Sequence, residues 1–185
     1  AGELYALEAP YNSTPRVLRF NASGEPLGQW GARGDADGEF ESPADIELAP
    51  DGRVLVADDD LYRIQRFDSQ GRFQARVLDK NSGSALRFPA FKIAPDGTLY
   101  LLGLSGNGFE RFDLDGAPLG SLTLHLSPDD PRVYPVFDLL RTVAIDAAGA
   151  LLLADSEGAL SHFSAAGVRD YQVGTTAVRG PTDYT

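Results

Sequence analysis

Hydrophobic and polar residues alternate in short runs along this chain. Four such runs follow one another at residues 46–49, 53–58, 63–68 and 72–77. Side chains of a β-strand point alternately to its two faces, so alternation with a period of two predicts strands. The turn Pro50-Asp51-Gly52 separates the first two runs, and its Gly supplies the positive φ that a tight reversal requires. Residues 46–77 therefore predict four consecutive antiparallel strands.

The same arrangement of runs and turns recurs twice further along the chain. The third copy comprises residues 91–97, 98–102, 109–113 and 119–124, and the fourth comprises 143–146, 150–154, 159–163 and 168–173. No helical periodicity of useful length appears beside them. The pattern predicts an all-β protein.

A short motif marks each repeat: a Phe, a small polar residue, two variable residues and a Gly. Its four copies begin at Phe20, Phe67, Phe112 and Phe163, so that successive copies lie 45 to 51 residues apart. This period is typical of a β-propeller, in which each repeat is one four-stranded antiparallel blade. We expect one propeller domain over residues 1–185 with four blades. Their expected bounds are 182–185 plus 1–40, 41–86, 87–140 and 141–181.

The two ends of the chain complement each other. Residues 1–5 align with 51–55, so the first repeat begins without the first of its four strands. Residues 180–185 align with 42–47, which is that same strand. Pairing of residues 182–185 with the first blade would close a four-bladed ring and cover exposed strand edges. The alternative is that the four repeats are a segment of a larger propeller.

Composition narrows the classes of function. The formal net charge is −11, so a nucleic-acid phosphate backbone would be repelled, and we expect no nucleic-acid partner. The chain has no Cys, which excludes disulfides and thiolate chemistry. No apolar run reaches the length of about 20 residues that a membrane helix needs, so we expect no membrane span. The acidic, Met-free composition favours a secreted or periplasmic protein.

One stretch carries a family resemblance. Residues 31–46 (Gly-Ala-Arg-Gly-Asp-Ala-Asp-Gly-Glu-Phe-Glu-Ser-Pro-Ala-Asp-Ile), then Val56-Ala57-Asp58, then residues 63–68 (Arg-Ile-Gln-Arg-Phe-Asp) resemble an NHL repeat. The other three repeats share with that family only the turn glycines, the strand pattern and the closing Phe. The resemblance implies a β-propeller whose loops contact protein partners. We therefore expect a non-catalytic scaffold or protein-binding module.

The longest connection between predicted strands holds the candidate partner-binding residues. It runs from Ser127 to Arg141 and contains a concentration of apolar side chains that a blade does not need. If they are exposed, these side chains would anchor an interface, and if they are not, the segment would form a lid on the ring. The candidates are Tyr134, Val136, Phe137 and Leu139.

The alternative function is that of a calcium-dependent propeller enzyme. Lactonases and lyases of similar architecture gather acidic side chains around a metal in the central channel, and repeat alignment brings Asp45, Asp146 and Asp183 toward such a position. Carboxylate oxygens suit Ca²⁺, and no other cofactor is expected. The chain has two His, too few for a three-His zinc centre. The run Asp58-Asp59-Asp60 is either a solvated turn or a second, weaker cation candidate.

Overall fold

The secondary structure of this protein is entirely β in the part of the chain that its computed structural model describes. That part comprises residues 2–9, 13–79, 91–102, 108–126, 140–155 and 158–174. The strands of the first two sheets are β1 (Leu4–Glu8), β2 (Arg16–Phe20), β3 (Pro26–Trp30), β4 (Pro43–Leu48), β5 (Val54–Asp58), β6 (Arg63–Phe67) and β7 (Phe73–Leu78). The strands of the other two are β8 (Phe91–Ile93), β9 (Leu99–Leu102), β10 (Gly108–Phe112), β11 (Pro118–Thr123), β12 (Leu140–Ile145), β13 (Leu151–Asp155), β14 (Leu160–Phe163) and β15 (Arg169–Val173).

Each sheet is an antiparallel meander in which neighbours along the chain are hydrogen-bonded. Strands β4–β7, β8–β11 and β12–β15 form four-stranded sheets, and β1–β3 form a three-stranded one. In the first sheet Leu4 pairs with Phe20, just as Val54 pairs with Phe67 in the second. Strands β1–β3 therefore correspond to the last three strands of a blade, as the alignment of residues 1–5 with 51–55 predicts.

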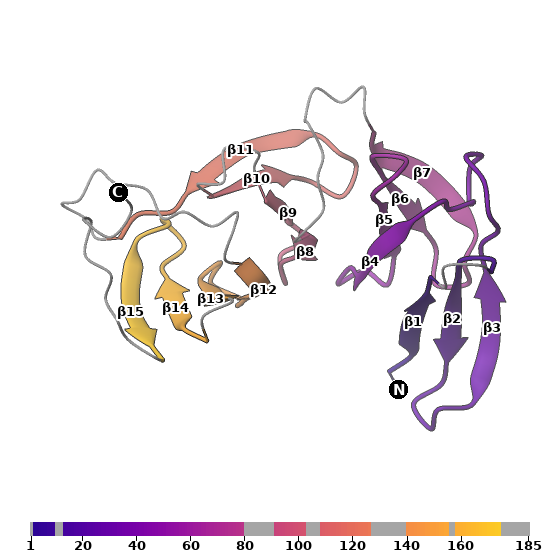
Figure 1. The fold of residues 1–185 in the computed structure, drawn as a ribbon, viewed down its shortest axis with the longest axis horizontal. Helices are drawn as coiled ribbons and strands as arrows, with labels where there is room; N and C mark the ends of the chain where they lie inside the picture. Colours follow the sequence, from indigo (N-terminus) through magenta and orange to yellow (C-terminus); the bar gives the residue numbers. More distant parts are fainter. Residues whose placement is uncertain are drawn as a thin grey trace.

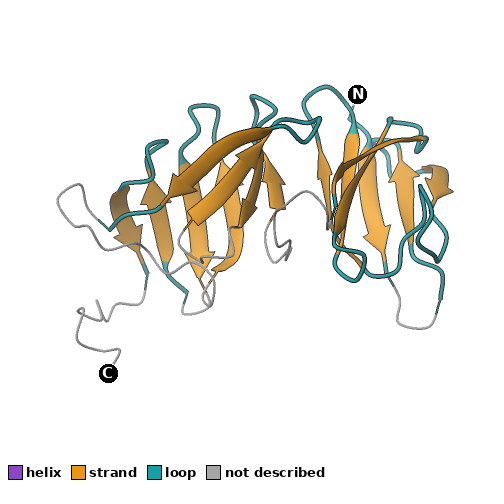
Figure 2. Ribbon diagram, turned by 90° about the horizontal axis from the view of Figure 1, so that it is seen from above, coloured by secondary structure: helices purple, strands orange, loops and turns teal. Residues whose placement is uncertain are grey.

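The four sheets lie side by side in an arc, as the blades of a β-propeller do (Figure 1). In each described blade the first strand lies on the inner side of the arc and the last strand on the outer side. Seen from above, the strands run between two rims of turns and connections (Figure 2). The predicted closing strand, residues 182–185, lies outside the described residues, so closure of the ring stays a prediction.

Apolar side chains fill the space between neighbouring blades. One cluster joins the first and second sheets, with Phe40, Val56 and Phe67 buried against Trp30. Corresponding clusters lie between the second and third sheets and between the third and fourth. The motif residues Phe67, Phe112 and Phe163 are each buried in one of these clusters, so the Phe of the motif fills the space between blades.

The motif glycines let the turns approach the preceding blade. Gly71, Gly116 and Gly167 all have φ between 80° and 88°, which favours Gly over other residues. A Cβ atom at Gly71 would overlap the ring of Trp30, and one at Gly116 or Gly167 would overlap a main-chain carbonyl of the sheet before it. The glycine of the motif therefore serves both the turn and the packing between blades.

Hydrogen bonds among Glu3, Tyr5 and Arg19 of the first sheet also connect it to the second sheet. Arg19 donates hydrogen bonds of 2.9 and 2.6 Å to the two carboxylate oxygens of Glu3. The Tyr5 hydroxyl lies 2.7 Å from Glu3 and 3.1 Å from the carbonyl oxygen of Ser69, in a turn of the second sheet. The hydrogen bond from Arg19 is the main cause that lowers the pKa of Glu3 to about 2. Burial, followed by its bond to Glu3, raises the pKa of Tyr5 to about 12.

Candidate functional site

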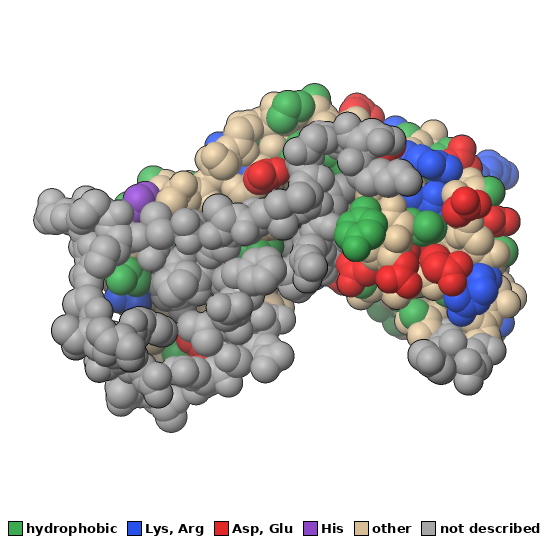
Figure 3. Space-filling model, turned by 45° about the horizontal axis from the view of Figure 1, so that its top comes forward, with side chains coloured by type: hydrophobic (Ala, Val, Ile, Leu, Met, Phe, Trp, Pro, Cys, Tyr) green, Lys and Arg blue, Asp and Glu red, His purple; other side chains and the backbone are tan. Residues whose placement is uncertain are grey.

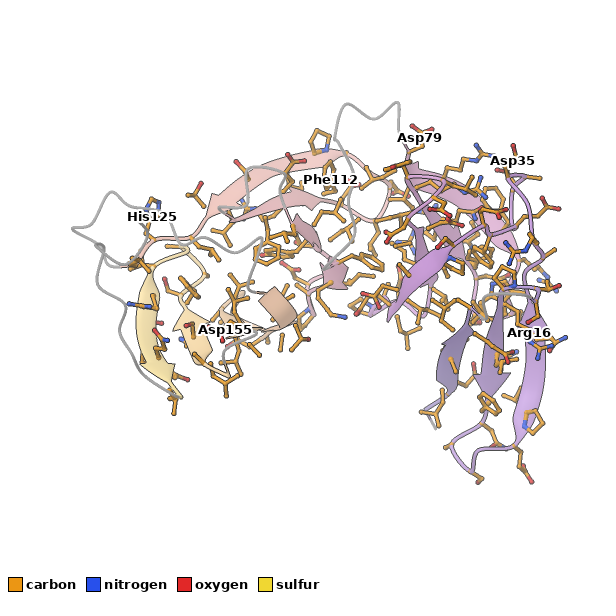
Figure 4. All side chains as sticks on the ribbon, in the orientation of Figure 1. Arg16, Asp35, Asp79, Phe112, His125 and Asp155 are labelled. Atoms are coloured by element: carbon orange, nitrogen blue, oxygen red, sulfur yellow. The ribbon has the colours of Figure 1, made fainter. Side chains whose placement is uncertain are left out.

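A buried arginine holds the connection that leads into the second blade. Arg63, on β6, is 2% exposed. Its guanidinium donates to three main-chain carbonyls, those of Asp35 at 2.7 Å, Ala36 at 3.1 Å and Glu39 at 2.7 Å. Asp35 is labelled in Figure 4. Burial lowers the pKa of Arg63, but a guanidinium stays charged at neutral pH, so the cation is matched by carbonyl dipoles.

Gln65 and Asp58 complete this arrangement. The side-chain amide of Gln65 donates to the Glu39 carbonyl at 2.8 Å, and its oxygen accepts from the Gly38 amide at 2.9 Å. The fully buried carboxylate of Asp58 accepts from the backbone amides of Glu41, Ser42 and Leu61 at 2.8, 3.1 and 3.2 Å. A buried polar group is costly unless it is hydrogen-bonded, and here each has several partners.

The polar residues of the NHL-like stretch are thus largely structural. At the end of β5 the Asp58 carboxylate bonds the following turn through the Leu61 amide. Repeat alignment does not reveal the second task of Asp58, because Glu41 and Ser42 precede it by 17 and 16 residues. The carboxylate joins the connection before β4 to the turn after β5.

That turn presents an exposed aromatic ring in an unusual backbone conformation. Tyr62 has φ 49° and is the one described residue other than Gly with a positive φ. Its side chain is 47% exposed, next to the exposed residues Asp59 and Asp60. A non-Gly residue in the left-handed region costs about 1–3 kcal/mol and is concentrated at functional sites. The turn nevertheless holds this conformation, because Asp58 anchors its base.

The surroundings of this turn are acidic. In the face shown in Figure 3, Asp and Glu side chains lie on the half of the molecule that carries the first two sheets, together with Lys and Arg side chains. Some are paired: Arg33 lies 2.8 Å from Glu41, and Arg76 lies 2.7 Å from Asp37. Pairs this exposed are worth little energetically, and the formal charge of the whole chain remains −11. The face would attract a positively charged partner.

A second polar cluster lies on the inner strands of the second and third blades. Lys92 of β8 forms an ion pair with Glu47 of β4, and its Nζ lies 3.6 Å from a carboxylate oxygen of Asp45. Burial raises the pKa of Glu47 despite the Lys92 cation. Burial acts to lower the pKa of Lys92, but the hydrogen bond and charge of Glu47 outweigh it, so the pKa is raised.

The predicted metal ligands have different surroundings. Asp45 lies within β4 beside Lys92, whereas Asp146 follows β12 and accepts the amides of Ala148 and Ala150 at 2.8 and 2.9 Å. By register Thr142, not Asp146, corresponds to Asp45, since Thr142 pairs with Ala154 and Asp45 with Ala57. No three His, Asp or Glu side chains of the described ranges gather around a common point. Asp183 lies outside those ranges, and the calcium site stays a prediction.

The predicted partner-binding residues Tyr134, Val136, Phe137 and Leu139 also lie outside the described residues. Two residues that the sequence argument missed are Lys92 and Tyr62. Lys92 could have been found from its place on an inner strand opposite an acidic one. Tyr62 carries no sequence signal, because its φ follows from how Asp58 and the two strands fix the turn.

Within the described ranges no helix is long and apolar enough to cross a membrane.

Comparison with known proteins supports the fold. No protein-family model matches the sequence, and no curated protein matches it significantly. Among solved structures, a protein of unknown function from Bacteroides caccae is 11% identical with a TM-score of 0.56, over 94% of this chain and 58% of its own. Virginiamycin B lyase from Staphylococcus aureus is 14% identical with a TM-score of 0.52, over 98% and 60%. A protein provisionally named as a gluconolactonase is 16% identical with a TM-score of 0.56, over 89% and 58%.

These likenesses concern architecture. At identities of 11% to 16% they show that the chain has the β-propeller fold. The chain spans between 42% and 60% of the length of seven solved structures that it matches. The activities that these names give belong to those proteins.

Proposed function

We propose that this chain is a protein-binding propeller module and that the turn after β5, residues 59–62, is its contact surface. The observation that carries the proposal is Tyr62, a half-exposed aromatic ring on a backbone held at φ 49°. Aromatic rings are over-represented among the few interface residues that supply most of the binding energy. The function is that of a non-catalytic scaffold.

The turn is prepared for binding by the buried groups beneath it. Asp58 bonds the Leu61 amide at 3.2 Å, and the Asp59 amide donates to the Ser42 carbonyl at 3.0 Å. A loop that is already ordered loses little conformational entropy when a partner binds. The backbone strain at Tyr62 is already present in the free protein, so it does not reduce the free energy of binding.

The partner chemistry follows from charge. Asp59 and Asp60 share the turn with Tyr62 in a chain of net charge −11, so a partner with Lys or Arg beside an apolar or aromatic pocket would fit. The NHL resemblance supports the same function, because propellers of that family present loops to proteins. We propose membership of that family on the stretch from Gly31 to Asp68.

Affinity enrichment from the source organism, with quantification by mass spectrometry, tests the proposal. Proteins that the wild type retains should be lost with Tyr62→Ala and kept with Leu119→Ala, a variant of a 50% exposed residue on β11. Equal retention by all three proteins would refute the assignment of the surface. Thermal unfolding of each variant checks that the fold is intact.

The apolar connection holding Tyr134, Val136, Phe137 and Leu139 is proposed as a second contact segment. Replacing Tyr134 and Phe137 with Ala should weaken a partner complex without changing the melting temperature. A large loss of stability would place both rings in the core and exclude them from an interface. The same enrichment experiment reports on both surfaces.

One observation favours the calcium-dependent enzyme as the alternative. Asp45 and Glu47 both approach a single cation, the Lys92 ammonium, on inner strands of the propeller. Two structural neighbours are named as a lyase and a lactonase, which is consistent with chemistry in such a channel. Isothermal titration with Ca²⁺ decides: binding by the wild type that Asp45→Asn weakens and Asp51→Asn leaves intact would support the enzyme. A titration in which the wild type shows no heat of binding would exclude this alternative.

A further inference from the structure

A basic side chain recurs at the same place in each blade. It immediately precedes the motif Phe, and the four copies are Arg19, Arg66, Arg111 and His162. The strand register shows the same equivalence, because Arg66 pairs with Leu55 on β5 as Arg111 pairs with Tyr100 on β9. The repeat thus places one basic group near the same end of every blade.

In the first and fourth blades this basic group contacts a carboxylate of its own sheet. Arg19 donates hydrogen bonds to both carboxylate oxygens of Glu3, and the Nδ1 atom of His162 lies 2.9 Å from a carboxylate oxygen of Asp170. Glu3 immediately precedes β1, and Asp170 lies where the register of β15 shifts. A carboxylate therefore reaches the basic group from either neighbouring strand.

In the second blade the carboxylate comes from the next blade. Arg66 donates to the Leu114 carbonyl oxygen at 2.6 Å and forms an ion pair with Asp115, and both partners lie in the turn that joins β10 to β11. A second guanidinium, that of Arg53, lies 3.7 Å from the same carboxylate. The Arg66 side chain is 13% exposed, so a charge that is largely withdrawn from water has an anion beside it.

In the third blade the basic group has no such carboxylate among the described residues. The residues at the positions of Glu3, Asp170 and Asp115 are Thr98, Leu119 and Ala166, respectively. Within the described ranges the half-buried Arg111 has no ion-pair partner, and its buried Nε atom has no hydrogen-bond acceptor. The Nε atom of Arg66 also has no acceptor, but Nη1 of that residue has two. Arg111 is therefore a cation with no counter-ion at any of the three positions that supply one elsewhere.

The surroundings of Arg111 leave room for a ligand. Gly120 pairs with Arg111 on β11, and a Cβ atom at Gly120 would meet nothing within 4 Å. The turn of the fourth sheet lies against the end of β11, since a Cβ at Gly167 would overlap the Thr123 carbonyl oxygen. Residues 165–166 of that turn are exposed and have only methyl side chains. A ligand can therefore approach the guanidinium between β11 and this turn.

We propose that Arg111 binds a carboxylate ligand at the junction of the third and fourth blades; the residue precedes Phe112, which is labelled in Figure 4. The ligand class follows from the repeat, because the equivalent group contacts a carboxylate in each of the other three blades. Guanidinium and carboxylate form charge-assisted hydrogen bonds, which are stronger where water is partly excluded. The carboxylate belongs to a small organic acid or to an acidic side chain of a partner protein.

This site is independent of the Tyr62 turn. Successive turns of an antiparallel meander alternate between its two rims. The Tyr62 turn joins β5 to β6 at one rim, whereas Arg111 lies next to the turn that joins β10 to β11 at the other. The two surfaces belong to different blades and opposite rims, so loss of one by substitution should leave the other intact.

Side-chain NMR on the 185-residue chain tests the proposal with acetate as the probe. The Nε–Hε signal of Arg111 is assigned by its loss in Arg111→Lys. At constant ionic strength, acetate should shift this signal to saturation with a dissociation constant on the order of 10 mM, whereas chloride should not. The signal of Arg72, whose side chain is 76% exposed, is the internal control. An Arg111 signal that moves no more than that of Arg72 would overturn the proposal.

Two substitutions exchange the properties of neighbouring junctions. Ala166→Asp supplies the carboxylate that Arg111 lacks, so it should abolish the response to acetate and raise the melting temperature by about 2–4 °C. This gain should vanish when Ala166→Asp is combined with Arg111→Gln. Asp115→Ala removes the carboxylate beside Arg66, whose signal should then respond to acetate. An Ala166→Asp protein that still shows the full acetate shift would refute a site at this junction.

The enrichment experiment distinguishes the two sources of the carboxylate. If a partner protein supplies it, Arg111→Gln should release proteins that Tyr62→Ala retains. If a small acid supplies it, the set of retained proteins should not change. Native mass spectrometry of the chain purified from its source should then show a bound organic acid that is lost in Arg111→Gln.

Discussion

The guanidinium of Arg63 lies 2.7 Å from the main-chain carbonyl oxygen of Glu39, 24 residues earlier in the chain. This contact ties the connection before the second blade to a strand in the middle of that blade. It also explains why an arginine is buried at a place where an apolar side chain would satisfy the pattern of the strand. The main-chain carbonyls of the connection point away from water and accept hydrogen bonds from the Arg63 guanidinium instead.

Removal of that donor should cost considerable stability. Arg63→Ala removes three hydrogen bonds to main-chain carbonyls, although the Glu39 carbonyl keeps the Gln65 amide as a donor. The change also opens a cavity, so we expect a loss of about 3 kcal/mol. Denaturation in urea measures it. Arg72→Ala, at a side chain that is 76% exposed, is the matched control and should lie within about 0.5 kcal/mol of the wild type.

Packing at the motif glycine can be separated from its backbone conformation. Gly71 and Gly52 have φ of 82° and 86°, so Ala pays about the same conformational cost at each. A Cβ at Gly71 meets the Trp30 ring, and one at Gly52 meets nothing within 4 Å. Gly71→Ala should therefore destabilise by about 1–3 kcal/mol more than Gly52→Ala in chemical denaturation. Equal losses would mean that the turn alone requires the glycine.

The first blade should become less stable in acid. The folded-state pKa of Glu3 is about 2, below its ordinary value of 4.5, because of the hydrogen bond from Arg19. Its contribution is therefore complete above pH 4.5 and is lost as the pH falls toward 2. Glu3→Gln should lower the melting temperature at pH 7 and have a much smaller effect at pH 2, where about half of the Glu3 carboxylate is protonated in the folded protein. Glu8→Gln, whose ion pair with Arg16 is more exposed, is the control.

The same substitution should act on Tyr5. The hydrogen bond to Glu3 is the second cause, after burial, of the rise in the pKa of Tyr5 to about 12. An absorbance titration of the phenolate should therefore show one tyrosine ionising at lower pH in Glu3→Gln than in the wild type. An unchanged titration curve would contradict the contact between the two side chains.

Relief of the strain at Tyr62 should separate stability from binding. Gly adopts φ 49° without a steric penalty, so Tyr62→Gly should stabilise the free protein by up to about 1 kcal/mol. The same change removes the exposed ring and should abolish partner retention. Thermal unfolding and the enrichment experiment measure the two effects. Tyr62→Phe keeps the ring and the strain, and should leave both properties close to the wild type.

The inner-strand ion pair should make stability depend on pH once its cation is removed. Lys92→Gln leaves Asp45 and Glu47 close together without a counter-ion, at a cost of about 1–2 kcal/mol near pH 7. The pKa of Glu47 is already raised by burial and should rise further without Lys92. Acidification to about pH 5 should therefore restore part of the lost stability. A loss that does not vary with pH would point to packing.

Much of the fold could be predicted from the sequence because its information is local and repeated. The alternation around Ile46 to Val77 and the Phe-to-Gly motif predict strands, turns and blades, and the described sheets confirm them. The candidate site could be predicted from the sequence only in part. Asp45 and Asp146 both lie near the first strand of a blade, but the strand register makes Thr142 the equivalent of Asp45 and places Asp146 in the following turn, where it bonds the backbone. A shift of a few residues is invisible in a pattern of period two.

The repeat, the blade as its unit, the buried Phe and the glycine turns can be derived from the sequence, because each follows from side-chain alternation and local backbone geometry. Which polar groups contact one another depends on the three-dimensional packing of the chain. Lys92 of the third blade forms an ion pair with Glu47 of the second, and Arg63 donates to the Glu39 carbonyl in the connection before its blade. Asp58 bonds the turn in which Tyr62 has a positive φ. These contacts depend on distances between segments far apart in the chain, which only the packing of one blade on another sets.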